Sequence, residues 1–308
     1  MSTVTRVTLV QNVPTGAPML NDFKVETAPA PVEASLNANE LIIRPLYLSC
    51  DPYMRGRLTG SGDRYPIDGL GVGIGDVVTG GMFKWESKFS LWRQATQEAS
   101  YVNLIGALGM PGFTGYVGLV TLCQPKKGET VLVSAASGAV GQIVVQLAKA
   151  RGLRVVATAG SDDKVEYVKS LGADVAFNYK TCGSFAKAIR QAAPEGVDIF
   201  FDNVGGEFLD ATLNCMKPFG RIAECGMISQ YNATSETAYH IRNLSQMINK
   251  KLTMYGYIVS DYYAKPAYKD FISEVAGLEN APQALLDLFE GSNFGKRVIK
   301  VASRGQKL

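Results

Sequence analysis

The fold of this chain is decided by the stretch VLVSAASGAVG, residues 131–141, in which an apolar run leads into a turn of small residues. The run from Val131 to Ala135 predicts a buried strand, because a short, nearly continuous apolar segment before a turn is typical of a strand covered on both faces. The residues that follow, Gly141 to Ala150, predict a helix that is stopped by Gly152. The stretch is therefore a strand–turn–helix unit.

The turn carries the spacing Ala136-x-Gly138-x-x-Gly141, which is the dinucleotide-binding fingerprint with alanine in place of the first glycine. Gly138 lets the backbone approach a pyrophosphate closely, and Gly141 lets the helix pack against the sheet. The N–H groups at the start of the helix then present a partial positive charge to the phosphates. Alone the spacing is a weak signal, but the strand before it and the helix after it are the context that such a site requires.

The alternation of strands and helices continues along the middle of the chain. Further strands are expected at residues 154–159, near 174–177, and at 198–201, 221–225 and 252–258. Helices are expected after a cap at Ser161 as far as Gly172, and at residues 184–193, 208–216 and 241–249. Six strands with intervening helices predict a doubly wound parallel sheet, the Rossmann type of α/β fold, which begins near Glu129.

The end of the second strand indicates which dinucleotide is bound. An NAD-selective site carries an acid there, about 20 residues past the loop, to bind the ribose hydroxyls. This chain has Gly160 and Ser161 at that position, followed by Lys164. Small residues leave room for a 2′-phosphate and a lysine neutralises it, so NADPH is favoured over NADH. The alternative for Lys164 is an ordinary lysine on a helix surface.

The composition is that of a folded protein with a substantial core. The 308 residues are 46% hydrophobic and 19% charged, and the net charge of +3 is too small to indicate nucleic-acid binding. The five cysteines lie far apart and there is one histidine, His240, so neither a disulfide framework nor a metal site is expected. Because the chain shows no signal peptide and no apolar run of membrane-spanning length, we expect no membrane association and a cytoplasmic protein.

Six stretches spread over nearly the whole chain together resemble one branch of the medium-chain dehydrogenase/reductase superfamily. They are YLSCDPYMRGR at 47–57, LGMPGFT at 108–114, FNYK at 177–180, DNVGG at 202–206, CGMISQY at 225–231 and NFGK at 293–296. The branch is that of the zinc-independent, NADPH-dependent alkenal/one oxidoreductases, which includes prostaglandin reductases, plant double-bond reductases and curcumin reductase. The absence of zinc ligands from the sequence fits this branch.

The resemblance implies a second domain beside the Rossmann domain. A GroES-like, β-rich substrate domain is expected at residues 1–113, with residues 264–308 returning to it, and the NADPH-binding domain at residues 114–263. Glycine, proline and short β-branched runs in the first 112 residues also predict irregular β structure. The implied reaction reduces the carbon–carbon double bond of small α,β-unsaturated aldehydes (enals) or ketones (enones). A homodimer is expected from the family alone.

The resemblance also implies the residues of the coenzyme site. The pyrophosphate is expected on Gly138, Ala139, Val140 and Gly141, and the adenosine phosphate end at Gly160, Lys164 and Tyr179. The rest of the coenzyme is expected to contact Pro52, Tyr53, Asn203, Cys225, Gly226, Met227, Ile228, Ser229, Gln230, Tyr231, Tyr257, Ile258, Val259 and Asn293.

The implied reaction defines the side chain that catalysis needs. Hydride transfer to the β-carbon leaves negative charge on the carbonyl oxygen, so a hydrogen-bond donor must face that oxygen and a proton must reach the α-carbon. A neutral tyrosine suits the donor role, and by resemblance Tyr262 is the first candidate, with the adjacent Tyr263 as the alternative. Tyr53 is expected to line the substrate pocket. For each tyrosine the competing interpretation is a half-buried packing residue.

The chain is shorter than the family pattern, and the missing residues are expected in the substrate domain. Gaps are expected where residues 71–73 meet 75–76, between residues 91 and 108, and near Glu274 and Val275. Missing strands expose sheet edges and open the core. Two alternatives therefore stand beside the enone reductase: a quinone reductase of the same superfamily, which the DPYMR motif at 51–55 disfavours, and a non-catalytic NADPH-binding relative.

Overall fold

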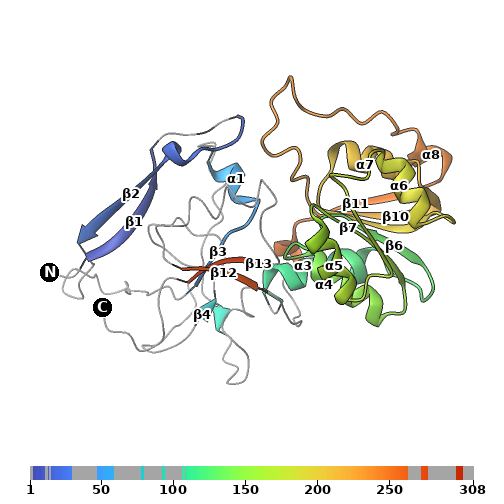
Figure 1. Ribbon diagram of the computed structural model, residues 1–308, viewed down its shortest axis with the longest axis horizontal. Helices are drawn as coiled ribbons and strands as arrows, with labels where there is room; N and C mark the ends of the chain where they lie inside the picture. Colours follow the sequence, from blue (N-terminus) through green and yellow to red (C-terminus); the bar gives the residue numbers. More distant parts are fainter. Residues whose placement is uncertain are drawn as a thin grey trace. The chain divides into compact units, whose positions relative to one another are not determined.

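The computed structural model describes residues 3–10, 13, 15–29, 47–58, 78–79, 92–93, 106–107, 109–262, 272–276 and 296–300. The chain divides into two compact units. The first comprises Met1–Val102, Ser273–Ser292 and Arg297–Leu308, and the second comprises Asn103–Ile272 and Asn293–Lys296. The second unit contains the large sheet and most of the helices, which run from green to orange in Figure 1.

The second unit is built on a parallel sheet of six strands. They are β6 (Thr130–Val133), β7 (Arg154–Ala159), β8 (Val175–Asn178), β9 (Val197–Asp202), β10 (Met216–Glu224) and β11 (Thr253–Gly256). Their order is β11-β10-β9-β6-β7-β8, and each neighbouring pair is parallel. The chain starts in the middle, runs to one edge and then returns to the other side of β6. This order confirms the predicted Rossmann fold and places its switch point between β6 and β9.

Short connections join the strands to helices. The helices are α3 (Met110–Tyr116), α4 (Gly141–Ala150), α5 (Asp162–Ser170), α6 (Phe185–Ala192), α7 (Gly206–Leu213) and α8 (Gln246–Asn249). A π-helix, η3 (Val117–Leu122), continues α3, and a 3-10 turn, η4 (Val259–Tyr262), follows β11. Ser161 caps α5 as predicted, because its hydroxyl oxygen accepts a hydrogen bond from the Lys164 N–H at 3.4 Å.

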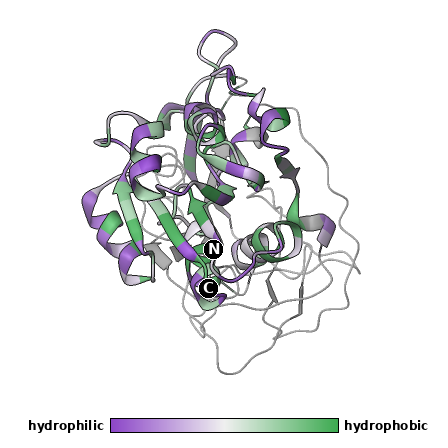
Figure 2. Cartoon of the chain, turned by 90° about the vertical axis from the view of Figure 1, so that its right-hand side faces the viewer, coloured by the Kyte–Doolittle hydropathy of each residue, from purple (hydrophilic) through white to green (hydrophobic). Residues whose placement is uncertain are grey.

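Alternate residues of the central strand enter two separate cores. Val131 and Val133 of β6 belong to the same cluster as Val144 of α4, whereas Leu132 belongs to the same cluster as Ile189 of α6. This division follows from the strand, in which successive side chains point to opposite faces. Accordingly, α4 and α5 lie on one side of the sheet and α6 and α7 on the other (Figure 1). The strands are largely hydrophobic, while the helices outside them carry hydrophilic residues (Figure 2).

The predicted helix at residues 241–249 is wrong for its first half, since the structure has only α8 (Gln246–Asn249) there. The buried carboxylate of Asp210 accepts hydrogen bonds from the backbone N–H groups of Arg242 and Asn243 at 2.9 and 2.8 Å. These bonds fix the backbone of residues 242 and 243 against α7, ahead of the point where α8 begins.

The predicted helix at residues 208–216 is displaced along the chain. It begins earlier, at Gly206, and ends at Leu213, so that Met216 already belongs to β10. Met216 pairs with Val197 of β9 before the register shifts towards Arg221, and this pairing ends the helix sooner than the apolar pattern predicts.

The first unit is β-rich in its described residues. It contains an antiparallel pair, β1 (Thr3–Leu9) and β2 (Phe23–Pro29), joined through the turn η1 (Leu20–Asp22), and a short pair, β4 (Val78–Thr79) and β5 (Trp92–Arg93). A third sheet has the order β12-β13-β3, with β3 (Tyr47–Ser49), β12 (Ile272–Ala276) and β13 (Lys296–Lys300). A short helix, α1 (Met54–Arg57), follows β3, and the Arg55 guanidinium donates to the carbonyl oxygens of Val13 and Gly16 at 2.8 Å each.

The expected gaps are only partly within the described residues. The junction of residues 71–73 with 75–76 lies outside them, as does most of the segment between 91 and 108. Near Glu274 and Val275, where a missing strand was expected, β12 is present and pairs with β13. The segment ISEVA carries two β-branched residues, Ile272 and Val275, which favour an extended backbone.

Candidate functional site

The turn after β6 is built as the sequence predicts. The Gly138 N–H donates to the Ala135 carbonyl oxygen at 2.9 Å, which closes the turn. A Cβ on Gly141 would lie 2.4 Å from the same oxygen and 2.7 Å from the Cα of Ala136, so only glycine lets α4 start this close to the strand. Gly138 has no such conflict below 3.1 Å, and its lack of a side chain leaves the backbone open to a ligand. The turn and the first turn of α4 therefore form a cradle for phosphate.

The ends of β7 and β8 form a second part of the site. A Cβ on Gly160 would lie 2.8 Å from the Tyr179 hydroxyl oxygen, so the glycine allows this ring to pack across the end of β7. Burial raises the pKa of Tyr179 and keeps its hydroxyl neutral. The nearest acid beyond the strand end, Asp162, accepts a hydrogen bond from the side-chain amide of Asn178 at 2.9 Å. No acidic residue occupies the strand end itself, at Gly160 or Ser161.

Lys164 lies in the first turn of α5 and is buried, at 5% exposure. Burial lowers the pKa of its ammonium group, and the positive charge of Lys180 lowers it further. Two repelling ammonium groups at the end of β7 attract an anion, because a phosphate between them relieves the repulsion. This arrangement fits the 2′-phosphate of NADPH better than the free ribose hydroxyls of NADH.

A network that sequence reasoning missed lies at the switch point. The fully buried carboxylate of Asp202, at the end of β9, accepts hydrogen bonds from the Ser134 hydroxyl at 2.8 Å and from the Val204 and Gly205 N–H groups at 2.9 and 3.0 Å. Asn203, which was predicted, donates its side-chain amide to the Ser134 carbonyl oxygen at 2.8 Å. The one sequence signal for the network is an acid that directly follows an apolar strand.

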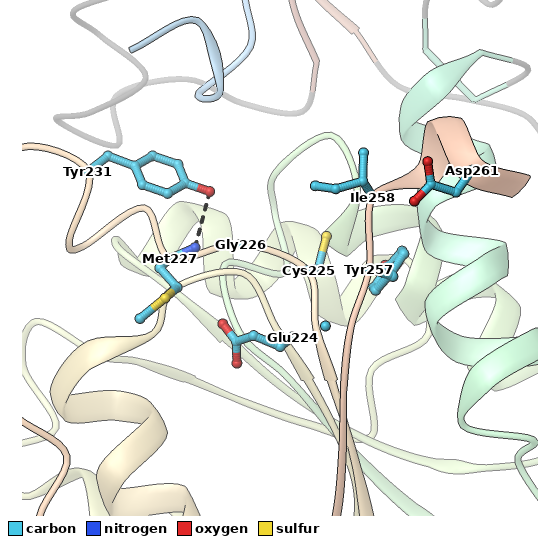
Figure 3. Close-up of a pocket in the computed structure, with 9 residues that line it drawn as sticks. Glu224, Cys225, Gly226, Met227, Tyr231, Tyr257, Ile258 and Asp261 are labelled. Atoms are coloured by element: carbon cyan, nitrogen blue, oxygen red, sulfur yellow. Dashed lines mark hydrogen bonds between the residues drawn. The ribbon is translucent and has the colours of Figure 1, made fainter. Parts of the chain in front are cut away.

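A pocket of about 420 Å³ opens at the carboxyl ends of β10 and β11 (Figure 3). Its volume is within the range of small-molecule sites. Tyr231 and Met227 lie on one side of it, with Ile258 and Asp261 on the other. The complete lining is Glu224, Cys225, Gly226, Met227, Tyr231, Gly256, Tyr257, Ile258 and Asp261.

The thiol and phenol groups of the pocket wall are held neutral. Burial raises the pKa of Cys225 to about 12, and a hydrogen bond with Tyr257 opposes this effect. Burial likewise raises the pKa values of Tyr231 and Tyr257. The Tyr257 hydroxyl donates to the Thr114 carbonyl oxygen at 2.9 Å, and the Met227 N–H donates to the Tyr231 hydroxyl oxygen at 3.1 Å. These three side chains therefore form an uncharged part of the wall, while the exposed acid Asp261 also lines the pocket.

Two further acids belong to this region, Glu224 in the pocket lining and the buried Asp202 beside it, and sequence reasoning did not select either. Burial raises the pKa of Asp202 to about 6, against the hydrogen bonds that lower it. Burial and then the charge of Asp202 raise the pKa of Glu224 to about 8. At pH 7 the charge resides on Asp202 and the proton on Glu224.

Ten of the predicted coenzyme residues follow β10 or β11. Six of them line the pocket: Cys225, Gly226, Met227, Tyr231, Tyr257 and Ile258. Ile228, Ser229 and Gln230 form the turn after β10, where the Ser229 hydroxyl donates to the Val204 carbonyl oxygen at 2.6 Å. Val259 is buried at the start of η4.

The tyrosines predicted for the reaction lie in different parts of the chain. Tyr262 ends η4, and its ring meets the ring of Tyr257 edge to face with centroids 6.5 Å apart. Pro52 and Tyr53 belong to the first unit, just before α1, and Tyr53 is exposed. Tyr263 and Asn293 lie outside the described residues.

A zinc site does not fit the described part of the chain. Within it, no three His, Cys, Asp or Glu side chains gather in a way that could hold a metal ion. Nor does any helix of the described segments have the length and apolarity needed to cross a membrane.

Comparison with known proteins identifies relatives over nearly the whole chain. The family model "Zinc-binding dehydrogenase" matches residues 139–276, and "N-terminal domain of oxidoreductase" matches residues 6–83. The 2-alkenal reductase (NADP(+)-dependent) of Nicotiana tabacum is 41% identical, over 96% of each chain. Prostaglandin reductase 1 of Mus musculus is 38% identical, over 92% of this chain and 95% of the relative.

A solved structure has the same fold. CurA from Vibrio vulnificus in complex with NADPH is 32% identical, with a TM-score of 0.79 over 97% of this chain and 100% of that chain. The alignment with the tobacco enzyme spans 334 positions, more than the 308 residues of this chain. Some residues of the tobacco enzyme therefore have no counterpart here, in agreement with the expected shortening.

The crowding at Gly141 predicts the effect of a side chain in the phosphate turn. We expect Gly141→Val to weaken NADPH binding by about tenfold or more, as the loss of one charged hydrogen bond of about 1.5 kcal/mol would. Fluorescence titration measures the dissociation constant. Gly183→Ala, at a site with a φ of +70° and no atom within 4 Å, is the control for a general loss of stability. Equal affinities of the two variants would contradict the role of the turn.

The charge at Lys164 predicts coenzyme selectivity. Lys164→Ala is expected to weaken NADPH binding by about 10- to 100-fold, the equivalent of about 1.5–3 kcal/mol, and to leave NADH binding nearly unchanged. Lys169→Ala is the matched control, since Lys169 lies on the same helix and its ammonium pairs with Glu166 at 2.8 Å. An unchanged ratio of NADPH to NADH affinity in Lys164→Ala would remove this residue from the 2′-phosphate site.

Proposed function

The chain belongs to the medium-chain dehydrogenase/reductase family of zinc-binding dehydrogenases, and from this we propose that it reduces the carbon–carbon double bond of α,β-unsaturated aldehydes and ketones with NADPH. The observation that carries the proposal is a dinucleotide turn and a small-molecule pocket at the same edge of a parallel sheet. Ligands of doubly wound folds bind at this edge, next to the switch point. The near full-length similarity to a 2-alkenal reductase supports the substrate class.

The coenzyme is proposed to lie across the carboxyl ends of the strands. The turn at residues 138–141 holds its pyrophosphate, and Lys164 with Tyr179 holds the adenosine phosphate end. The nicotinamide half then reaches the ends of β9, β10 and β11, where the pocket lies. When bound there, NADPH supplies the hydride for the β-carbon of the substrate. The neutral thiol and phenol groups of the pocket wall suit the nicotinamide ring, since they offer no charge that must be desolvated.

The substrate carbonyl oxygen needs a hydrogen-bond donor, because it becomes negative as the β-carbon is reduced. We assign this role to the hydroxyl of Tyr262, whose ring is held by edge-to-face packing on Tyr257 beside the pocket. Tyr263 is the alternative donor. Tyr53 is proposed as part of the substrate-binding surface that the first unit supplies.

The assembly and the compartment are further proposals. The partner that the proposed reaction requires is a small-molecule enal or enone, and the protein is proposed to be a cytoplasmic homodimer that binds neither nucleic acid nor membranes. None of the five cysteines, all of which are among the described residues, forms a disulfide. Free thiols are usual in a reducing compartment.

A panel of acceptors tests the proposed function. NADPH oxidation is measured with enals, enones and quinones, beside a direct titration of NADPH binding. We expect oxidation with enals and enones and little with quinones. Oxidation with quinones alone favours the quinone reductase, and binding without oxidation of any acceptor favours the non-catalytic relative.

Removal of the Tyr262 hydroxyl tests the catalytic assignment. Tyr262→Phe is expected to lower kcat by about 10²- to 10³-fold, as loss of one donor to a developing oxyanion does, with NADPH affinity unchanged. Tyr263→Phe is the matched control because it removes the neighbouring hydroxyl. Wild-type rates in Tyr262→Phe would exclude this residue, and a selective loss in Tyr263→Phe would transfer the role to its neighbour.

A further inference from the structure

Glu224 is a half-buried acid that has no role in the site described above. It is the last residue of β10, and its Cα is paired with Asp202 of β9 on one side and with Gly256 of β11 on the other. Its side chain lines the pocket (Figure 3), yet both carboxyl oxygens are buried and have no hydrogen-bond partner among the described residues. Buried polar atoms are nearly always hydrogen-bonded, so the lack of partners for these two oxygens needs a physical explanation.

Asp202 and Glu224 together hold one proton, and this proton is bound to Glu224. The Asp202 carboxylate receives hydrogen bonds from the Ser134 hydroxyl and from two backbone N–H groups, whereas Glu224 receives none that the structure describes. Hydrogen bonds of this kind favour the charged form, and a neighbouring charge disfavours a second one. The negative charge therefore stays on Asp202, and Glu224 keeps the proton.

The other titratable groups that face this carboxyl do not alter the division. Cys225 and the ring hydroxyls of Tyr231 and Tyr257 are neutral at pH 7, because burial raises the pKa of each. Asp261 of η4 and Glu207 of α7 are exposed to solvent, where their charges are screened.

The two acids lie where two loops of the coenzyme site join. The N–H groups of Cys225 and Gly226 donate to the Asp202 carbonyl oxygen at 2.9 and 3.2 Å, and the Ser229 N–H donates to the Val204 carbonyl oxygen at 3.1 Å. These bonds hold residues 203–206 against residues 225–231. A second negative charge at this junction would repel Asp202 in a region of low dielectric and act to separate the loops.

We propose that Glu224 is a positioning residue, whose proton keeps residues 203–206 and 225–231 together in the arrangement that binds the nicotinamide half of NADPH. Loss of this proton leaves two adjacent carboxylates and lowers coenzyme affinity. The inference rests on the proposed function only for the identity of the coenzyme.

The dissociation constant of NADPH as a function of pH tests the proposal. In the wild type it is expected to rise about tenfold from about pH 7 to about pH 9, since the protonated fraction of Glu224 falls from about nine-tenths to about one-tenth. Glu224→Gln cannot ionise and is expected to bind with a constant affinity over this range. Parallel titrations with NADH remove the contribution of Lys164 at the 2′-phosphate.

Glu207→Gln is the matched control, because it removes an exposed acid from the neighbouring helix, and it is expected to keep the wild-type profile. A Glu224→Gln variant with the wild-type pH dependence overturns the proposal, as does a wild-type affinity that is constant from pH 7 to 9. The titration requires no turnover. Failure to oxidise NADPH with any acceptor would contradict the proposed function and leave this result standing.

The melting temperature of the coenzyme-free protein gives a second readout. Glu224 holds its proton up to about pH 8 in the folded chain, but ionises near its ordinary pKa of 4.5 when unfolded. The stability linked to this proton is therefore present below about pH 4.5 and is lost as the pH rises to about 8. Relative to Glu224→Gln, the wild type is expected to lose melting temperature between about pH 5 and pH 8. A constant difference between the two proteins overturns the proposal.

Discussion

The buried carboxylate of Asp202 joins the two strand ends between which the sheet reverses its order. Its oxygens accept hydrogen bonds from the Ser134 hydroxyl, directly after β6, and from the N–H groups of Val204 and Gly205, which follow β9. A buried charge persists only if such donors surround it, so the geometry of both strand ends is fixed by this group. The phosphate turn begins directly after Ser134, and residues 203–206, which hydrogen-bond to the loop at residues 225–231 beside the pocket, begin directly after Asp202. Both halves of the proposed coenzyme site thus depend on one hydrogen-bonded anion.

The second unit could be predicted closely where local pattern and tertiary structure agree. The strand Arg154–Ala159 and the helix Gly141–Ala150 have the predicted ends, because apolar spacing, a glycine stop and burial all favour the same limits. The prediction was wrong where a contact with a residue distant in the sequence determines the backbone conformation. Asp210 fixes the backbone of residues 242 and 243 through two hydrogen bonds, and nothing near those residues in the sequence indicates this.

The site could be predicted in part for a similar reason. Phosphate turns have a local spacing, and the pocket residues after β10 are recognisable as a segment. Ser134, Asp202 and Glu224 carry no such signal, since their importance arises from strand register and burial. An acid at the end of an apolar strand is indistinguishable by sequence from the first polar residue of a loop. Only the pairing of β9 with β10 brings the two acids together.

The neutral wall of the pocket has a chemical consequence for Cys225. Alkenals are electrophiles that alkylate thiolates through the same β-carbon that a reductase supplies with hydride, and only the ionised thiol is an efficient nucleophile. Because burial raises the pKa of Cys225 to about 12, its sulfur remains protonated at neutral pH. An enzyme of this class can then carry a thiol in its pocket without being inactivated by the compounds it consumes.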